Sequence, residues 1–213
     1  MSNIKLVHSG GNSVSLTTPT SNPASNITFK LPQSDGTAGQ VLTTDGNGNL
    51  SWITVAGGLT VAHQFRLSSD KNIGNTQTVL DANWEKVDNG SYGSLGSFAD
   101  PSSGVFTFPT TGIYLVTFTS YFEDSGYNTN AQIQIQGTAN NSDYDTVSAT
   151  HFGTQYDQSG NNYATGFVST IIDVTDVTQV KVRFRAYSNS TVSWDGSSTQ
   201  SRTAATFIRL GDT

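Results

Sequence analysis

From residue 61 to the C-terminus, apolar side chains recur at every second position in short segments separated by Gly, Asn, Asp and Ser. A period of two marks a β-strand with one buried face, and short strands bounded by turn residues are typical of an all-β sandwich. No segment of the 213 residues combines a helical period with capping residues. The alternation therefore predicts an all-β domain over residues 61–213.

The clearest predicted strand is Gly112–Phe122, which is apolar on both faces. Tyr114, Val116 and Phe118 share one face, and the opposite face is also largely apolar. A strand of this kind is expected at the centre of a sheet. By contrast, Ala131–Gln136 alternates Ile with Gln, which predicts a half-exposed strand.

The C-terminal part of the domain predicts three more strands. Phe167–Val174 and Val180–Tyr187 flank a turn near Asp176, which predicts a hairpin between them. Thr203–Leu210 is expected to close the domain, with three of its residues available for the core: Ala205, Phe207 and Ile208.

The first 57 residues have a different pattern, with apolar runs of a few residues separated by Gly, Pro, Asn and Ser. Such short segments bury too little surface to form a core within one chain, because an isolated hairpin is marginal in water. We therefore expect residues 1–57 to form an extended, β-rich stem that needs neighbouring chains.

A β-hairpin is predicted at residues 39–53, with its turn at Asp45-Gly-Asn-Gly-Asn49. The turn is rich in oxygen ligands, but an EF-hand counted from Asp45 would need Gly at the position of Leu50 and Glu at that of Ala56. A phosphate-binding loop would need a following helix, and the segment after Asn49 is strand-like. The Asp, Asn and Gly residues instead favour a tight turn.

Charge and composition exclude several classes of partner. Charged residues make up 12% of the chain, and the net charge of −6 arises after Gly57 without a basic cluster. Nucleic acid and anionic membranes are therefore not expected as partners. The chain has no cysteine, and no segment has the apolar length of a signal peptide or membrane span, so we expect a soluble protein that is not secreted by that route.

The segment Phe106–Phe118 carries a family resemblance. Its Phe, followed after five residues by Gly-x-Tyr-x-x-x-Phe, resembles the central motif of the C1q and tumour-necrosis-factor-like (TNF-like) jelly-roll family. The closing Thr206-Phe-Ile-Arg-Leu210 resembles that family's last strand. The resemblance implies a C1q/TNF-like jelly-roll head over residues 61–213.

The segment Phe29–Trp52 carries a second resemblance. Its Leu-Pro-x-x-x-Gly-x-x-Gly-Gln-x-Leu, followed by a turn and Leu-x-Trp, is similar to segments of fibre and other structural proteins of tailed phages, notably those of cyanobacteria. Both resemblances imply a homotrimer, in which three chains close a core that one stem cannot close. We expect core and trimer packing to rest on aromatic residues, with Trp52 at the point where three stems meet: Trp52, Phe106, Phe108, Tyr114, Phe118, Phe184 and Phe207.

Two polar segments combine aromatic side chains with amides and carboxylates, as sugar-binding and protein-binding loops do. The simpler interpretation is that both are solvated loops of the jelly roll, and calcium held by Asp143 and Asp145 is a weaker alternative. The candidate ligand-binding residues are Asn141, Asp143, Tyr144, Asp145, Tyr156, Asp157 and Tyr163. A basic stripe formed by Lys181, Arg183 and Arg185 is expected to be a solvated face, a partner for acidic groups of a neighbouring subunit, or an anion site.

Catalytic patterns are weak. Only two of the sixteen acidic residues are Glu, and the three histidines lack a paired metal-ligand spacing. No Gly-x-Ser-x-Gly elbow is present. We expect no enzyme activity, no metal and no cofactor.

Together these features predict a homotrimeric virion structural protein, a phage fibre or spike assembled in the host cytoplasm. Its stem is expected to bind other virion proteins, and its head to project outward. Two alternatives remain: a receptor-binding tip that recognises a host surface glycan or protein, and a protein that decorates and stabilises the capsid.

Overall fold

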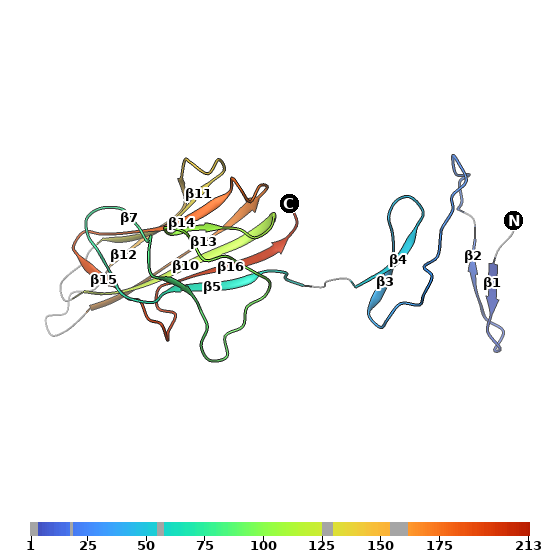
Figure 1. The fold of residues 1–213 in the computed structure, drawn as a ribbon, viewed down its shortest axis with the longest axis horizontal. Coiled ribbons are helices and arrows are strands. Elements are labelled where there is room, and N and C mark those ends of the chain that lie inside the picture. The colour runs from blue at the N-terminus through green and yellow to red at the C-terminus, as the bar shows by residue number, and fades with distance from the viewer. Residues whose placement is uncertain (1–3, 18, 55–57, 125–129, 154–161) are drawn as a thin grey trace. The chain divides into compact units, whose positions relative to one another are not determined.

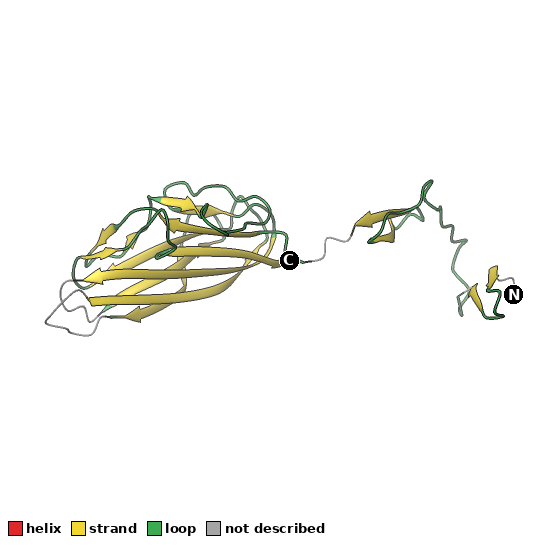
Figure 2. Cartoon of the chain, turned by 90° about the horizontal axis from the view of Figure 1, so that it is seen from below, coloured by secondary structure: helices red, strands yellow, loops and turns green. Residues whose placement is uncertain are grey.

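The computed structural model describes residues 4–17, 19–54, 58–124, 130–153 and 162–213. The chain divides into two compact units, Met1–Gly57 and Gly58–Thr213, which we call the stem and the head (Figure 1). The regular elements of the described residues are strands joined by loops (Figure 2). These residues include no helix of sufficient length and hydropathy to cross a membrane.

The stem contains two antiparallel hairpins. β1 (Ile4–Val7) pairs with β2 (Ser13–Leu16), and β3 (Gln40–Thr44) pairs with β4 (Leu50–Thr54) over the residues predicted to form a hairpin. None of the described stem residues is buried. The stem strands therefore have backbone pairing but no core of their own within one chain.

The head consists of two antiparallel sheets. The first sheet has the order β6-β15-β10-β16-β5-β8, and β13 is also paired with β10 along the whole length of that strand. Its strands are β5 (Ala62–Leu67), β6 (Lys71–Ile73), β8 (Trp84–Lys86), β10 (Gly112–Asp124), β13 (Asn162–Val174), β15 (Val192–Trp194) and β16 (Ala204–Gly211). The second sheet has the order β12-β11-β14-β7, with β9 also paired to β14. Its strands are β7 (Thr78–Val79), β9 (Val105–Thr107), β11 (Ala131–Thr138), β12 (Asp145–Phe152) and β14 (Lys181–Ser188).

The core lies between these sheets and is dominated by aromatic rings. Phe207 of β16 packs against Phe98, Phe106 and three other phenylalanines, with ring centroids 4.8–6.1 Å apart. Phe118 of β10 lies 4.7 Å from Phe184 of β14, which joins the two sheets. Burial of this cluster excludes water from the sandwich and stabilises the head.

β10 is the central strand of its sheet, as its two apolar faces predict. It pairs with β13 on one side and with β16 on the other. Tyr114, Val116 and Phe118 are fully buried, while Ile113 and Leu115 are only partly covered on the outer face.

The predicted hairpin between Phe167–Val174 and Val180–Tyr187 is wrong. These residues lie in β13 and β14, which belong to different sheets and pair with β10 and β11 respectively. The Asp176 turn, where the carboxylate accepts hydrogen bonds from the Thr178 backbone and hydroxyl, takes the chain across the sandwich. Each strand has an apolar face, and the fold buries these faces against each other instead of pairing the two backbones.

Two finer predictions also need correction. β11 is largely buried, because Gln134 and Gln136 form hydrogen bonds with Thr146 of β12 that cover their amides. Ile208 lies on the outer face of β16, since its neighbours Ala205 and Phe207 occupy the inner positions.

Candidate functional site

The outer face of the first sheet carries an apolar surface. In the register of the sheet, Leu115 of β10 lies between Ile171 of β13 and Ile208 of β16. Phe167 projects from the same face of β13, and its side chain is 58% exposed, while Ile171 is 63% exposed. We call this surface, formed by Leu115, Phe167, Ile171 and Ile208, the outer apolar face. Large aliphatic and aromatic side chains gathered on one open sheet face mark an interaction surface.

A tyrosine pair lies on the same side of this sheet, towards one end. The rings of Tyr121 and Tyr163 are stacked, with centroids 5.6 Å apart and an angle of 12° between planes. Partial burial, followed by the proximity of Tyr163, raises the pKa of the Tyr121 hydroxyl. Because β13 begins at Asn162, Tyr163 lies on a strand and not in a loop, as its choice as a ligand-binding residue had assumed.

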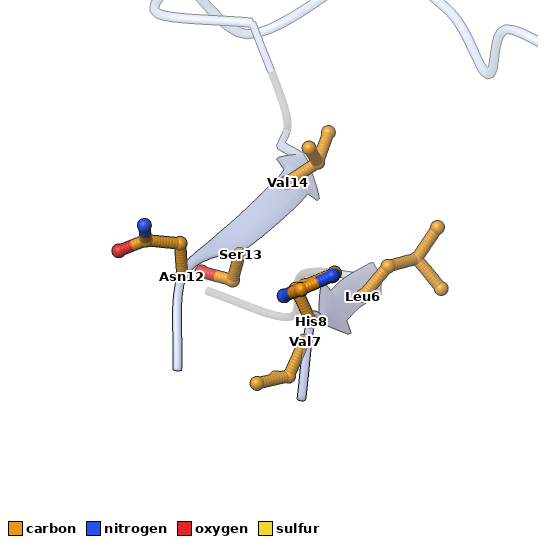
Figure 3. Close-up of a pocket in the computed structure, with 6 residues that line it drawn as sticks. All are labelled: Leu6, Val7, His8, Asn12, Ser13 and Val14. Atoms are coloured by element: carbon orange, nitrogen blue, oxygen red, sulfur yellow. The ribbon is translucent and has the colours of Figure 1, made fainter. Parts of the chain in front are cut away.

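The β1–β2 hairpin has a second uncovered apolar face. Ile4 lies opposite Leu16 and Leu6 opposite Val14, so the four aliphatic side chains share one face. A hollow of about 480 Å³ on this hairpin is lined only by residues of its own strands and turn, as Figure 3 shows for Leu6 and Val14. Nothing among the described residues covers these side chains.

The Asp45 turn is a self-contained structural element. The Asp45 carboxylate accepts hydrogen bonds from the side-chain amide of Asn49 and from the backbone N–H groups of Asn47 and Asn49, the latter two at 2.8 and 3.1 Å. These bonds, the one from the Asn49 side chain above all, lower the pKa of Asp45. Its oxygens are thus occupied by its own turn. Trp52 of β4 donates its indole N–H to the Ser34 carbonyl at 3.0 Å and remains 37% exposed.

The loop between β11 and β12 sends its side chains in two directions. Asp143 and Asp145 line a groove of about 340 Å³ together with Val147 of β12 and Ile172 of β13. Tyr144 points instead to the outer face of the second sheet, where the Cζ of Arg183 lies 4.0 Å from its ring centre. Asn141 adopts a left-handed conformation with φ of 57° in the intervening turn.

Solved structures of other proteins share the architecture of the head. The head is similar to Eiger TNF from S. frugiperda, with a TM-score of 0.56 and 14% identity over 73% of this chain and 96% of that one. Murine APRIL gives a TM-score of 0.51 with 13% identity, covering 70% and 98% of the two chains. The head is a TNF-like jelly roll.

Sequence comparison adds no closer assignment. No family model matches the chain, and no curated protein matches it. At these identities the likeness to solved structures establishes the jelly-roll fold and nothing about activity.

The jelly roll places the predicted aromatic residues inside one chain. Six of the seven lie in the single-chain core and are no more than 1% exposed: Phe106, Phe108, Tyr114, Phe118, Phe184 and Phe207. They are not on a surface that a second jelly roll could contact. Trp52, in the stem, is the remaining one.

The predicted ligand residues do not form one site. Asp143 and Asp145 face the groove, Tyr144 faces the opposite way, and Tyr163 lies on the first sheet. Tyr156 and Asp157 lie outside the described residues. Among the described residues, no group of three or more His, Asp or Glu side chains is arranged to hold a metal ion.

The outer apolar face is the feature that sequence reasoning missed. Phe167 and Ile171 alternate with Val168 and Ile172, so the strand is apolar on both faces. The sequence therefore contains the apolar residues of this surface, but the alternation alone does not reveal which face of the strand is buried in the sandwich.

Proposed function

We propose that this chain is a non-enzymatic, homotrimeric structural protein of a virion. In this proposal the stem attaches to other virion proteins and the jelly-roll head projects outward as a phage fibre or spike.

The observation that carries the proposal is the uncovered apolar surface on both units of the single chain. The outer apolar face of the head and the aliphatic face of the β1–β2 hairpin are both open to solvent. Apolar surface of this kind is stabilised by association, and three copies around an axis would cover equivalent faces at once.

The stem contributes two features to the proposal, one for the virion and one for the trimer. The segment Phe29–Trp52 resembles phage fibre proteins, and its Trp52 hairpin is held by local hydrogen bonds that leave Val41, Leu42 and Ile53 exposed. The stem also carries no net charge, because Lys5 and Lys30 balance Asp35 and Asp45. Three stems could therefore approach each other without net electrostatic repulsion.

Sedimentation of the purified full-length chain tests the trimer. The expected result is a species of three times the chain mass of 22.6 kDa at micromolar concentration. A monomer at these concentrations would contradict the proposal.

Quantitative mass spectrometry of purified particles tests the place in the virion. A few trimers per particle would support a fibre or spike, whereas hundreds of copies would favour capsid decoration. Absence of the chain from particles would remove the virion role, even if the protein is a trimer.

A further inference from the structure

The basic stripe on β14 lies on the outer face of the second sheet. Lys181, Arg183 and Arg185 are partly exposed, while the residues between them are buried in the core. Two residues of a strand advance the chain by ~6.6 Å, so the three cations extend over ~13 Å. The stripe continues in the same direction to Tyr187, which is also partly exposed.

No acidic residue lies beside the stripe in the sheet register. On β11 its neighbours are Thr138, Gln136 and Gln134. On the other side they are Thr107 and Val105 of β9 and Val79 of β7. Charges on neighbouring strands are usually stabilised by opposite charges across the ladder, and here the facing side chains are neutral.

Ion pairs do not compensate the stripe either. The ion pairs formed between described residues involve Arg66, Lys71, Lys86, Arg202 and Arg209, and none involves the three cations of β14. The carboxylates on either side of Tyr144 in the sequence, Asp143 and Asp145, line the groove with Val147 and Ile172 and do not face the stripe. The face that holds the two arginines is therefore cationic on a protein whose net charge is −6.

Arg183 is held in place by neutral groups. Its Nε donates to the Gln136 side-chain oxygen at 2.8 Å, and its guanidinium stacks on the Tyr144 ring. Burial raises the pKa of the Tyr144 hydroxyl, so the ring is neutral where it supports the cation. These contacts leave the two terminal nitrogens of Arg183 without a hydrogen-bond partner among the described residues.

Arg185 carries an unmet hydrogen-bonding capacity. One terminal nitrogen donates to the Gln77 carbonyl at 3.0 Å, but its buried Nε and the buried side-chain oxygen of Gln77 have no partner among the described residues. Partial burial and the neighbouring charge of Arg183 lower the pKa of the Arg185 guanidinium. An anion placed between the two arginines would offset this repulsion.

We propose that the β14 stripe, formed by Lys181, Arg183 and Arg185 with Tyr144 as a positioning residue, binds an acidic saccharide through its carboxylate or sulfate groups.

The surroundings favour a saccharide over other anions. Tyr144 and Tyr187 border the cations, and aromatic rings combined with hydrogen-bond donors suit sugar rings and their hydroxyls. A long polyanion such as nucleic acid would be repelled by the net charge of −6, whereas a stripe of ~13 Å matches a short array of anionic groups. The inference does not require a trimer, but it is compatible with one, because the stripe and the outer apolar face lie on opposite sheets.

Calorimetric titration of the full-length protein tests this assignment with four probes: a heparin-derived hexasaccharide for sulfate, a hexagalacturonate for carboxylate, a neutral dextran oligosaccharide and a polyglutamate peptide. At least one acidic saccharide is expected to bind more tightly than dextran and polyglutamate, and its affinity should fall as salt rises. The difference between hexasaccharide and hexagalacturonate identifies the anionic group.

Variants then locate the site. The double variant Arg183→Gln/Arg185→Gln is expected to lose at least about tenfold in affinity, because it removes charge-assisted hydrogen bonds. Lys5→Gln/Lys30→Gln changes the net charge equally in the stem and should bind as the original protein does.

Tyr144→Leu should weaken binding, whereas Tyr144→Phe, which keeps the ring, should retain it. Lys181→Gln, whose side chain has no hydrogen bond to described residues, tests the stripe if the double variant does not fold.

Four results would overturn the assignment. The first is binding of the acidic saccharides that is no tighter than binding of dextran, and the second is equal affinity of the stripe variants and the stem control. Equal or tighter binding of polyglutamate would indicate an acidic protein partner. Loss of the oligomer in the double variant, measured by sedimentation, would indicate that the stripe pairs with a neighbouring subunit. Failure of the chain to trimerise would contradict the proposed function but leave this inference standing.

Discussion

Phe207 is the residue on which the packing of the jelly roll most depends. It is fully buried and contacts five phenylalanine rings from both sheets. Phe207→Ala should lower the free energy of unfolding of the head by about 3–5 kcal/mol, since neighbouring rings cannot collapse into the space. Urea denaturation at low protein concentration measures this change. Phe167→Ala removes the same atoms from an exposed position, and an equal loss there would contradict the argument.

Asp195 is a buried carboxylate whose ionisation opposes folding. It is 5% exposed, and burial raises its pKa above the ordinary value of 3.8, although Arg202 donates to it at 2.9 Å. The native state then holds this proton more tightly than the unfolded chain does. Its contribution to stability is therefore greatest below pH 3.8 and falls as pH rises through the raised pKa.

Asp195→Asn should remove this dependence while keeping an acceptor for Arg202. Relative to the original protein, the variant is expected to gain stability progressively above pH 4, as measured by urea midpoints between pH 4 and pH 7. Asp81, whose pKa Lys71 lowers, contributes a slope of opposite sign in both proteins and cancels in the comparison. A constant difference between the two proteins across this range would contradict the prediction.

The β3–β4 hairpin depends on two glycines with different surroundings. Gly46 and Gly48 both have positive φ, at 79° and 85°, so an alanine at either position costs about 1–2 kcal/mol of backbone strain. A Cβ at Gly48 would also collide with the Thr28 carbonyl, whereas a Cβ at Gly46 meets nothing within 4 Å. Gly48 further accepts the Lys30 N–H at 2.8 Å.

Gly48→Ala should therefore release the segment around Lys30 from the hairpin, and Gly46→Ala should not. Amide hydrogen exchange measured by NMR is expected to show faster exchange of the Lys30 N–H in the first variant only. Equal effects of both substitutions would mean that backbone strain alone governs the hairpin.

At the scale of strands and turns, the sequence predicted correctly those elements whose structure depends on residues close together in the chain. The Asp/Asn/Gly turn and the strand with two apolar faces follow from residues close in sequence, and the structure contains the hairpin and the central strand β10 there. The pairing of β13 with β10 depends on residues about 50 positions apart and on burial between sheets. For the same reason the sequence identified Tyr144 and Tyr163 as possible ligand residues but did not reveal that they lie on different sheets.

At the scale of the whole molecule, assembly of the head should control the structure of the stem. The aliphatic face of β1–β2 is too small to hold a partner alone, because stable interfaces bury about 800 Å² on each side. Trimerisation of the heads would raise the effective concentration of the three stems, so that their small faces associate. Stem strands are then expected to be stable in the trimer and marginal in the monomer.

Ile171→Asp tests this coupling, because it places a carboxylate in the outer apolar face, which the proposed trimer would bury between copies of the head. The trimer is expected to dissociate at concentrations at which the original protein remains assembled, since an unpaired charge is costly to bury. Val147→Asp is the control, because it introduces the same carboxylate in place of a similar aliphatic side chain at a half-exposed position of β12. Hydrogen exchange of the dissociated variant should show loss of protection in β1–β4 while β10 stays protected. Stem amides that remain equally protected in the monomer would mean that the stem folds without its neighbours.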